Sequence, residues 1–268
     1  MTLFIIGIGL CDVEDISVKG LNTLRSCDTV FLEHYTSILS SSKEELEDFY
    51  QKPVTLAPRT LVEGEAEENI LLPAKEKDIA LLIVGDVFGA TTHTDLQLRA
   101  KELGVTCEVI FNASILSAVG IVGLELYKYG KTTSIVFPDD GWLPHTPYDV
   151  IKQNKAVGLH TLCLLDIKVA EPNREDLLKG KTTPQPPRFM TVAQGIDVLL
   201  AIENERGENV LTPKTLAVGV ARLGHKDFKV ITGSLQELRE KNFGSPLHSL
   251  IISGKLSVVE EEALSCWD

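Results

Sequence analysis

At several points of this sequence an apolar run is followed by a turn that contains glycine or a polar residue. Such turns suit ligand binding, because their backbone and polar groups can contact a ligand. The run Ile79–Val84 ends in Gly85–Asp86, with Gly89 close behind. Thr2–Ile6 ends in a similar glycine-rich turn, and a third apolar run ends at Asn112. Glycine lets the backbone bend sharply and approach a ligand closely. An ordinary strand–turn–helix connection has the same spacing, so each turn alone leaves both interpretations open.

These turns need elements that bring them to one place. Ile79–Val84 is short, continuous and rich in Ile and Val, which predicts a central strand buried on both faces of a parallel sheet. Open α/β sheets bind ligands outside the carboxyl ends of their strands, so we expect the turns to lie together there. The repeated strand–turn–helix order predicts one parallel α/β domain over residues 1–113. Its other predicted elements are strands at 28–33 and 105–111 and helices at 18–24, 40–50, within 57–74 and at 96–103.

A second domain is predicted over residues 114–268. Ile115, Val119, Val122 and Leu126 share one helical face, which predicts a long helix that connects the two halves. Ser114 suits the N-cap of this helix, and capping does not exclude a ligand contact, because a helix N-terminus offers free backbone N–H groups. Strands are predicted at 133–137, 158–165, 216–221, 228–232 and 247–253 and helices at 148–156, after Thr191 and after Ser234, with hairpin-like spacing that favours a mixed sheet. Residues 138–144 and the proline-rich 180–188 are predicted loops.

Composition excludes several functional classes. The chain has 268 residues, 44% hydrophobic and 24% charged, as in globular proteins. A net charge of −12 disfavours nucleic-acid binding, which needs a basic surface. No apolar run approaches the length of a membrane span, and the start MTLFIIGIGL flows into a turn rather than forming a signal peptide. Widely spaced cysteines without CxxC pairs indicate reduced thiols in a cytosolic protein.

The common catalytic motifs are missing. The sequence has no GxSxG, no HExxH and no complete GxGxxG, because Asp12 stands where the third glycine belongs. These absences disfavour a nucleophile–base pair and a metal site. A lone histidine such as His34 or His160 more often has a structural hydrogen-bonding role than a catalytic one. From the residues alone, both an enzyme and a non-catalytic ligand-binding regulator remain open.

A resemblance narrows these possibilities. The segments LFIIGIGLCD, EHYTSIL, GDVFGATTHTDL, FNASILSAVG, HTLCLLDIKV, PPRFM, VGVARLG and PLHSLIISG occur in the order found in diphthine synthases, within the tetrapyrrole-methylase-like superfamily. The similarity covers essentially the whole chain. Two positions depart from the usual pattern: Val87 replaces a proline, and Cys11 replaces a glycine in the opening turn.

The resemblance implies a fold of two α/β domains with S-adenosylmethionine bound in the cleft between them, S-adenosylhomocysteine as product, and a homodimer. Asp86 is then expected near the polar ribose or amino-acid end of the cofactor; alternatively, it caps the following turn. Ile115, Leu165 and Leu223 would be apolar walls. Position by position, the implied cofactor contacts are Leu10, Asp86, Gly89, Ser114, Ile115, Leu165, Leu223 and His248.

The same resemblance implies a substrate and a reaction. Diphthine synthases methylate a histidine of translation elongation factor 2 that already carries a 3-amino-3-carboxypropyl group. Methyl transfer goes to the amino nitrogen and, in eukaryotic members, also to the carboxylate; LCLLDIKV and PPRFM favour the eukaryotic type. The sulfonium of the cofactor is already activated, so the resemblance implies no catalytic side chain. His93, beside the central turn, is the one candidate to lie near the acceptor proton, although a histidine in a loop more often has a structural hydrogen-bonding role. The reduced thiols favour a cytoplasmic location. A small-molecule tetrapyrrole methylase would share the fold and remains the main alternative.

Overall fold

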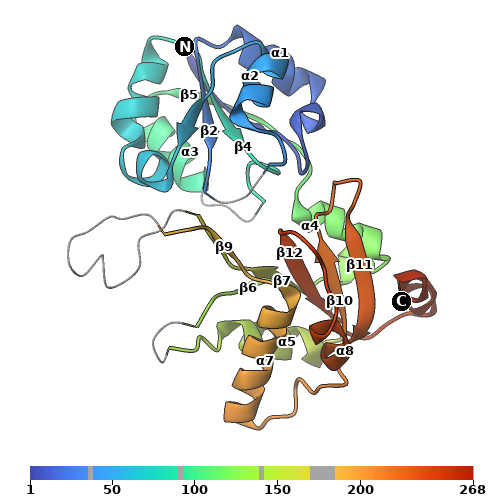
Figure 1. Ribbon diagram of the computed structural model, residues 1–268. Helices are drawn as coiled ribbons and strands as arrows, with labels where there is room; N and C mark the ends of the chain where they lie inside the picture. The colour runs from blue at the N-terminus through green and yellow to red at the C-terminus, as the bar shows by residue number, and fades with distance from the viewer. Residues whose placement is uncertain (36–38, 90–92, 139–141, 170–184, 268) are drawn as a thin grey trace. The chain divides into compact units, whose positions relative to one another are not determined.

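The computed structural model describes residues 1–35, 39–89, 93–138, 142–169 and 185–267 (Figure 1). The chain forms two compact units, Met1–Ala118 and Val119–Asp268, called unit 1 and unit 2 below. Each unit contains its own sheet and its own helices. The predicted α/β class with a parallel first sheet and a mixed second sheet is confirmed. The domain boundary after residue 113 stays a prediction.

Unit 1 is built on a parallel sheet in the order β3-β2-β4-β1-β5. Its strands are β1 (Thr2–Gly7), β2 (Thr29–Glu33), β3 (Thr55–Ala57), β4 (Ile79–Ile83) and β5 (Thr106–Ile110). Ile5 of β1 lies between Leu81 of β4 and Val109 of β5, which fixes the register. All residues of β4 are buried, as its continuous apolar run predicts. Parallel pairing brings the turns after β1, β4 and β5 to one edge of this sheet.

Helices cover both faces of the sheet in unit 1 (Figure 1). On one face, α1 (Val18–Ser26) and α2 (Lys43–Tyr50) pack against Ile6 and Leu82. On the other face, α3 (His93–Glu102) and the helical turns Thr60–Gly64 and Glu67–Leu71 pack against Leu3, Ile5 and Leu81. Alternate strand residues point to opposite faces of the sheet, so the strands contribute side chains to the apolar clusters on both faces. The predicted helices at 18–24, 40–50 and 96–103 are confirmed in position.

The long connecting helix predicted after Ser114 is wrong. The structure has a short α4 (Ile115–Ala118), followed by 3-10 turns at Val119–Val122 and Leu126–Lys128. Gly123 separates the two 3-10 turns with a φ of +91°, and a Cβ there would lie 2.3 Å from the Cβ of Ala263. A glycine is needed at this close approach, and its positive φ ends the helical pattern that the apolar spacing predicts.

Unit 2 contains a mixed sheet in the order β11-β10-β12-β7-β6. The strands are β6 (Thr133–Ile135), β7 (Thr161–Leu165), β10 (Leu216–Ala221), β11 (Lys229–Ser234) and β12 (His248–Ile252). Only the β6–β7 pair in this sheet is parallel. A short antiparallel pair, β8 (Ile167–Lys168) and β9 (Arg188–Phe189), was not predicted, and β9 includes the last residue of the predicted 180–188 loop. Residues 180–184 and 139–141 of the predicted loops lie outside the described residues.

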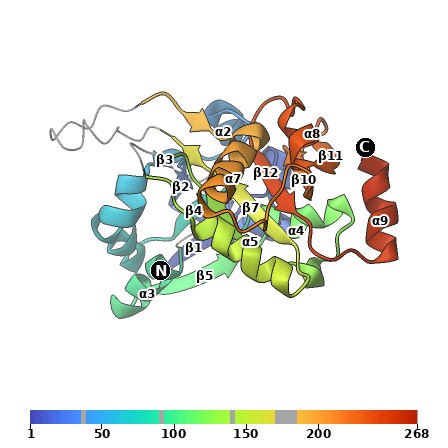
Figure 2. The same cartoon turned by 90° about the horizontal axis from the view of Figure 1, so that it is seen from below.

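In the part of unit 2 that the structure describes, four α-helices follow or connect the strands of this sheet. They are α5 (Thr146–Ala156), α7 (Val192–Arg206), α8 (Leu235–Arg239) and α9 (Val258–Leu264). Apolar residues of α5, α7 and α8 share one core with Cys163, Leu250 and Ile252 of the sheet, and Figure 2 shows α5 and α7 alongside β7. Capping boxes open α7 at Thr191 and α8 at Ser234, as the sequence predicts.

Candidate functional site

The turns after β1, β4 and β5 meet at the carboxyl edge of the sheet in unit 1. A Cβ added to Gly7 would lie 2.8 Å from the carbonyl oxygen of Gly85 and 3.0 Å from the Cβ of Asn112. The side-chain amide of Asn112 donates hydrogen bonds of 3.0 Å to the carbonyl oxygens of Gly7 and Asp15. The three turns are therefore tied to one another by close backbone approach and by Asn112.

The first turn is held by Asp15. Its carboxylate accepts hydrogen bonds from the backbone N–H groups of Leu10 at 3.0 Å and Cys11 at 2.7 Å. Gly9 has a φ of +86°, and a Cβ there would lie 2.3 Å from the Cβ of Asp15. Burial raises the pKa of the Cys11 thiol, so this cysteine is neutral at pH 7 rather than a thiolate nucleophile. Asp15 thus fixes the half-buried Leu10, a role that the sequence analysis missed.

Asp86 joins the second turn to the third. One carboxylate oxygen accepts the backbone N–H of Asn112 at 2.8 Å, and the other accepts the N–H of Phe88 at 3.2 Å. The second bond is the turn cap that the sequence analysis considered as an alternative to a ligand contact. The residue remains partly exposed. Capping and ligand binding are compatible, because each carboxylate oxygen accepts more than one hydrogen bond.

Gly89 and Ser114 lie against each other. A Cβ on Gly89 would be 2.6 Å from the Cβ of Ser114, so only glycine allows this approach. The hydroxyl of Ser114 accepts the N–H of Leu116 at 3.2 Å, which is an N-cap interaction at the start of α4. Ile115 follows, half buried. The predicted contacts of unit 1, from Leu10 to Ile115, therefore converge on one edge of the sheet.

The predicted contacts of unit 2 also lie together. His248 begins β12 and pairs with Ala221, the last residue of β10. Leu164 of β7 pairs with Ser249, and continuing this register places Leu165 beside His248. Leu223 follows β10 after one residue, and all three side chains are buried. Leu165, Leu223 and His248 thus occupy one end of the second sheet.

Arg222 holds this end of the sheet, although no sequence pattern pointed to it. Its φ is +51°, and its guanidinium donates hydrogen bonds to Asp227 and to the carbonyl oxygen of Phe243. His248 donates from Nε2 to the carbonyl oxygen of Ser245 at 3.0 Å. Burial lowers the pKa of His248, so its ring is neutral, and its buried Nδ1 has no hydrogen-bond partner among the described residues.

His93, the candidate proton acceptor, is buried inside unit 1. Its Nδ1 lies 3.1 Å from the carbonyl oxygen of Val87, and its Nε2 lies 3.3 Å from Glu33. Both ring nitrogens therefore face protein atoms. Among the described residues, no group of three or more His, Cys, Asp or Glu side chains is arranged to hold a metal ion. Within the same part of the chain, no helix combines the length and apolar character that crossing a membrane requires.

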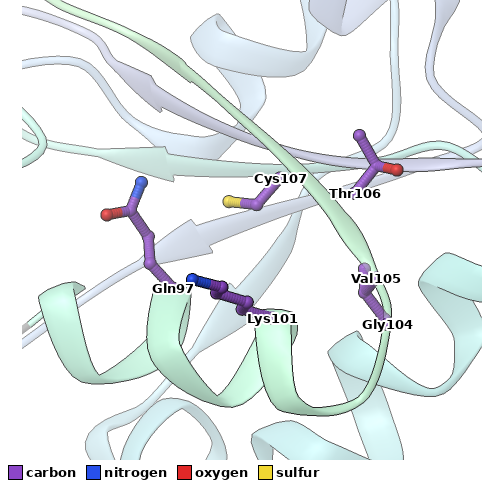
Figure 3. A pocket seen from close by; sticks show the side chains of 6 residues that line it. All are labelled: Gln97, Lys101, Gly104, Val105, Thr106 and Cys107. Atoms are coloured by element: carbon purple, nitrogen blue, oxygen red, sulfur yellow. The ribbon is translucent and has the colours of Figure 1, made fainter.

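A surface hollow lies elsewhere on unit 1, where α3 leads into the amino end of β5 (Figure 3). The thiol of Cys107 points toward Gln97 in this view, and burial raises its pKa. The residues that line the hollow are Gln97, Lys101, Gly104, Val105, Thr106 and Cys107. This hollow is at the opposite end of the strand from the three turns, and it contains none of the predicted contacts.

Comparison with known proteins identifies the family. The family model of tetrapyrrole (corrin/porphyrin) methylases matches residues 2–239. A bovine protein named diphthine methyl ester synthase is 52% identical over 268 residues, covering 98% of this chain and 94% of its own length. This chain belongs to the tetrapyrrole methylase family, in its diphthine methyl ester synthase branch.

Further relatives support this family assignment. The human protein of the same name is 50% identical, covering 98% of this chain and 94% of its own length. The crystal structure of a proposed diphthine synthase from Entamoeba histolytica superposes with a TM-score of 0.87 at 42% identity, covering 99% of this chain and 98% of that one. The resemblance inferred from the sequence is confirmed, and the chain is a methyltransferase.

Proposed function

We propose that this chain methylates the 3-amino-3-carboxypropyl-histidine of translation elongation factor 2, using S-adenosylmethionine as methyl donor. The observation that carries the proposal is identity of about half of all residues, over nearly the whole chain, to proteins named diphthine methyl ester synthase. The word ester in that name supports methylation of the carboxylate as well as of the amino nitrogen. The product is then the tetramethylated diphthine methyl ester rather than a trimethylated form.

The residues present fit such a cofactor. The space beside Gly85, at the carboxyl ends of the strands, is free of other atoms of the described residues. A Cβ on this residue would meet no such atom closer than 3.9 Å, so a ligand can approach the backbone here. In unit 2, the buried Nδ1 of His248 accepts no hydrogen bond from the described residues and suits a ligand donor. We propose that the contacts of unit 1 and those of unit 2 serve one cofactor molecule.

The proposed roles follow from the chemistry of each group. Asp86 keeps lone pairs for hydroxyl or amino donors while it accepts Asn112 and Phe88. Leu10, Ile115 and the buried leucines of unit 2 offer apolar contact to an adenine ring. S-adenosylmethionine supplies a methyl group on an already activated sulfonium. The task of the chain is therefore to align the acceptor and exclude water, and we propose no acid–base side chain for the transfer.

The partners of the reaction are also proposals. The acidic net charge of −12 favours encounter with a basic region of the elongation factor, because complementary charge accelerates association. An acceptor on a protein side chain requires an open approach to the site. The chain is proposed to act in the cytoplasm, where elongation factor 2 works, and as a homodimer, as the family resemblance implies.

Mass spectrometry of the substrate tests this proposal. Elongation factor 2 bearing the aminocarboxypropyl histidine is incubated with this protein and S-adenosylmethionine, and the modified peptide is weighed. The proposal predicts stepwise gains that end at four methyl groups, with the last one removed by mild alkali because it is an ester. A porphyrinoid acceptor is the matched control. Methylation of the porphyrinoid with none on the elongation factor would contradict the proposal and favour a small-molecule tetrapyrrole methylase.

A further inference from the structure

A carboxylate and an imidazole lie buried beneath the Asp86 turn. Glu33 is the last residue of β2, and His93 is the first residue of α3, far away in the sequence. Nε2 of His93 is 3.3 Å from Oε2 of Glu33. On the other side of the ring, Nδ1 is 3.1 Å from the carbonyl oxygen of Val87, the residue that follows Asp86. The ring therefore connects the end of β2 to the turn after β4.

The pair is poorly supported by other polar groups. The side chain of Glu33 is 0% exposed and that of His93 is 2% exposed. Among the described residues, neither oxygen of Glu33 has a hydrogen-bond partner, and the contact with Nε2 has the distance but not the alignment of a hydrogen bond. Burying a carboxylate with so little support opposes folding. A buried polar pair of this kind calls for an explanation beyond stability.

Hydrogen-bond chemistry limits the protonation of the pair. A carbonyl oxygen only accepts, so Nδ1 of His93 carries hydrogen and donates to Val87. A neutral ring would then present the lone pair of Nε2 to a carboxylate oxygen 3.3 Å away. Two acceptors at that distance repel each other unless a proton lies between them, carried by either partner. The contact with Glu33 is therefore favourable when one partner carries a proton toward the other, and the ring orientation that makes it keeps Nδ1–H directed at Val87.

The turn that this ring supports is the one that presents the proposed cofactor contacts. Val87 is completely buried and lies between Asp86 and Phe88, whose N–H bonds to the carboxylate of Asp86. Gly89 closes the same turn by donating its N–H to the carbonyl oxygen of Asp86 at 3.1 Å. Rotation of the Val87 peptide would therefore move both Asp86 and Gly89. The imidazole prevents this rotation by holding the Val87 carbonyl.

We propose that Glu33 and His93 are positioning residues for the cofactor-binding turn: Glu33 orients the imidazole, and the imidazole fixes the peptide of Val87. This inference rests on the proposed function, because it assumes that the turn binds S-adenosylmethionine. Neither residue touches the cofactor. They affect the affinity for the cofactor only indirectly, by fixing the backbone of residues 86–89.

Two substitutions of Glu33 separate positioning from bulk stability. In Glu33→Gln, the amide N–H can donate to Nε2 of a neutral ring, so the imidazole keeps its orientation. In Glu33→Met, a side chain of similar length has no donor for Nε2 and only a weak sulfur acceptor, so the orientation of the ring is no longer fixed. Isothermal titration with S-adenosylhomocysteine is expected to give roughly tenfold weaker binding for the Met variant. The Gln variant is expected to stay within about threefold of the wild-type affinity.

Backbone hydrogen exchange provides a readout that needs no cofactor. In the free protein, the amides of Phe88 and Gly89 are expected to exchange faster in Glu33→Met than in wild type, and to stay protected in Glu33→Gln. Leu24→Val is the matched control: Leu24 is buried on the opposite face of the sheet, and its substitution is expected to lower the melting temperature with unchanged affinity. His93→Phe is expected to weaken binding as Glu33→Met does, and the double variant no further.

The outcomes separate the two proposals. Failure of the wild-type protein to bind S-adenosylhomocysteine would contradict the proposed function, whatever the variants do. Wild-type binding combined with unchanged affinity in Glu33→Met would overturn the positioning role. An equal loss of affinity in Gln and Met, or additive losses in the double variant, would also overturn it. The positioning role is supported if Glu33→Gln keeps both the affinity and the amide protection at residues 88–89 that Glu33→Met loses.

Discussion

Replacement of Asp86 tests how the central turn works, because its carboxylate makes two identifiable bonds. The oxygens accept the N–H groups of Asn112 at 2.8 Å and Phe88 at 3.2 Å, and Asp86→Ala removes both bonds. A hydrogen bond to a charged group contributes about 1.5–3 kcal/mol. Because Asp86 is partly exposed, water can partly replace the lost oxygens. The lower value for each bond gives a loss of about 3 kcal/mol in the free energy of unfolding of unit 1.

The loss of cofactor affinity is expected to be at least tenfold in Asp86→Ala, which corresponds to about 1.4 kcal/mol. Asp86→Asn distinguishes the two roles of the side chain. Its amide oxygen can still accept the N–H of Asn112, but its NH2 group cannot accept the N–H of Phe88. If Asp86 acts by holding the turns together, Asn falls between wild type and Ala. If its charge contacts the cofactor directly, Asn loses nearly as much affinity as Ala.

Isothermal titration with S-adenosylhomocysteine on wild type, Asn and Ala gives the affinities. Thermal unfolding of the free proteins gives the stabilities, and only folded protein is titrated. Wild-type affinity in Asp86→Ala would refute the assignment of this residue to the cofactor site. A large loss of stability with unchanged affinity would leave the carboxylate only as a cap of its own turn.

Three further outcomes concern stability. Burial lowers the pKa of His160 below its ordinary value of 6.5. The contribution of its neutral ring to stability is therefore complete above pH 6.5 and is lost as the pH falls from there toward the lowered pKa of the folded state. The melting temperature should fall as the pH is lowered from 8 to 5, and His160→Gln should flatten this profile. Desolvation raises the pKa of Glu260, but its bonds to Lys128, backbone N–H groups and His160 outweigh this effect and lower the pKa to about 2. The contribution of this carboxylate to stability is therefore lost only as the pH falls from about 4.5 toward 2. Glu260→Ala should destabilise unit 2 by roughly 3 kcal/mol in denaturant titration at pH 7, and a loss under 1 kcal/mol would contradict the network seen here. Gly9→Ala should lower the melting temperature and weaken cofactor binding, because its Cβ would lie 2.3 Å from the Cβ of Asp15; an unaffected variant would show that the first turn adapts freely.

Local signals made much of the fold predictable. The apolar run of β4 indicates a strand buried on both faces, and the serine and threonine caps mark where α7 and α8 begin. Short elements escaped prediction because partners elsewhere in the chain stabilise them. β3, at Thr55–Ala57, forms only through pairing with β2, and β9 only through pairing with β8. The Ser114 helix was overestimated because apolar periodicity carries no information about the packing of Gly123 against Ala263.

The site shows the same division. Strand-end glycines and polar residues pointed to Asp86, Gly89 and Ser114, because their positions after apolar runs place them at the carboxyl edge of the sheet. Residues that act through their neighbours left no such signal. Asp15 follows the first turn as one of several acidic residues, although an aspartate shortly after a glycine turn is a detectable hint. The contact between Glu33 and His93 depends on tertiary structure alone.

Hydrogen exchange with and without S-adenosylhomocysteine tests most directly whether turns from both units bind one cofactor. We predict slower exchange at residues 8–12, 86–89 and 112–116 of unit 1 and, in the same experiment, at residues 222–224 and 247–249 of unit 2. The hollow beside Cys107 should be unaffected. Protection confined to one unit, or centred on that hollow, would contradict the proposal of a shared cofactor site.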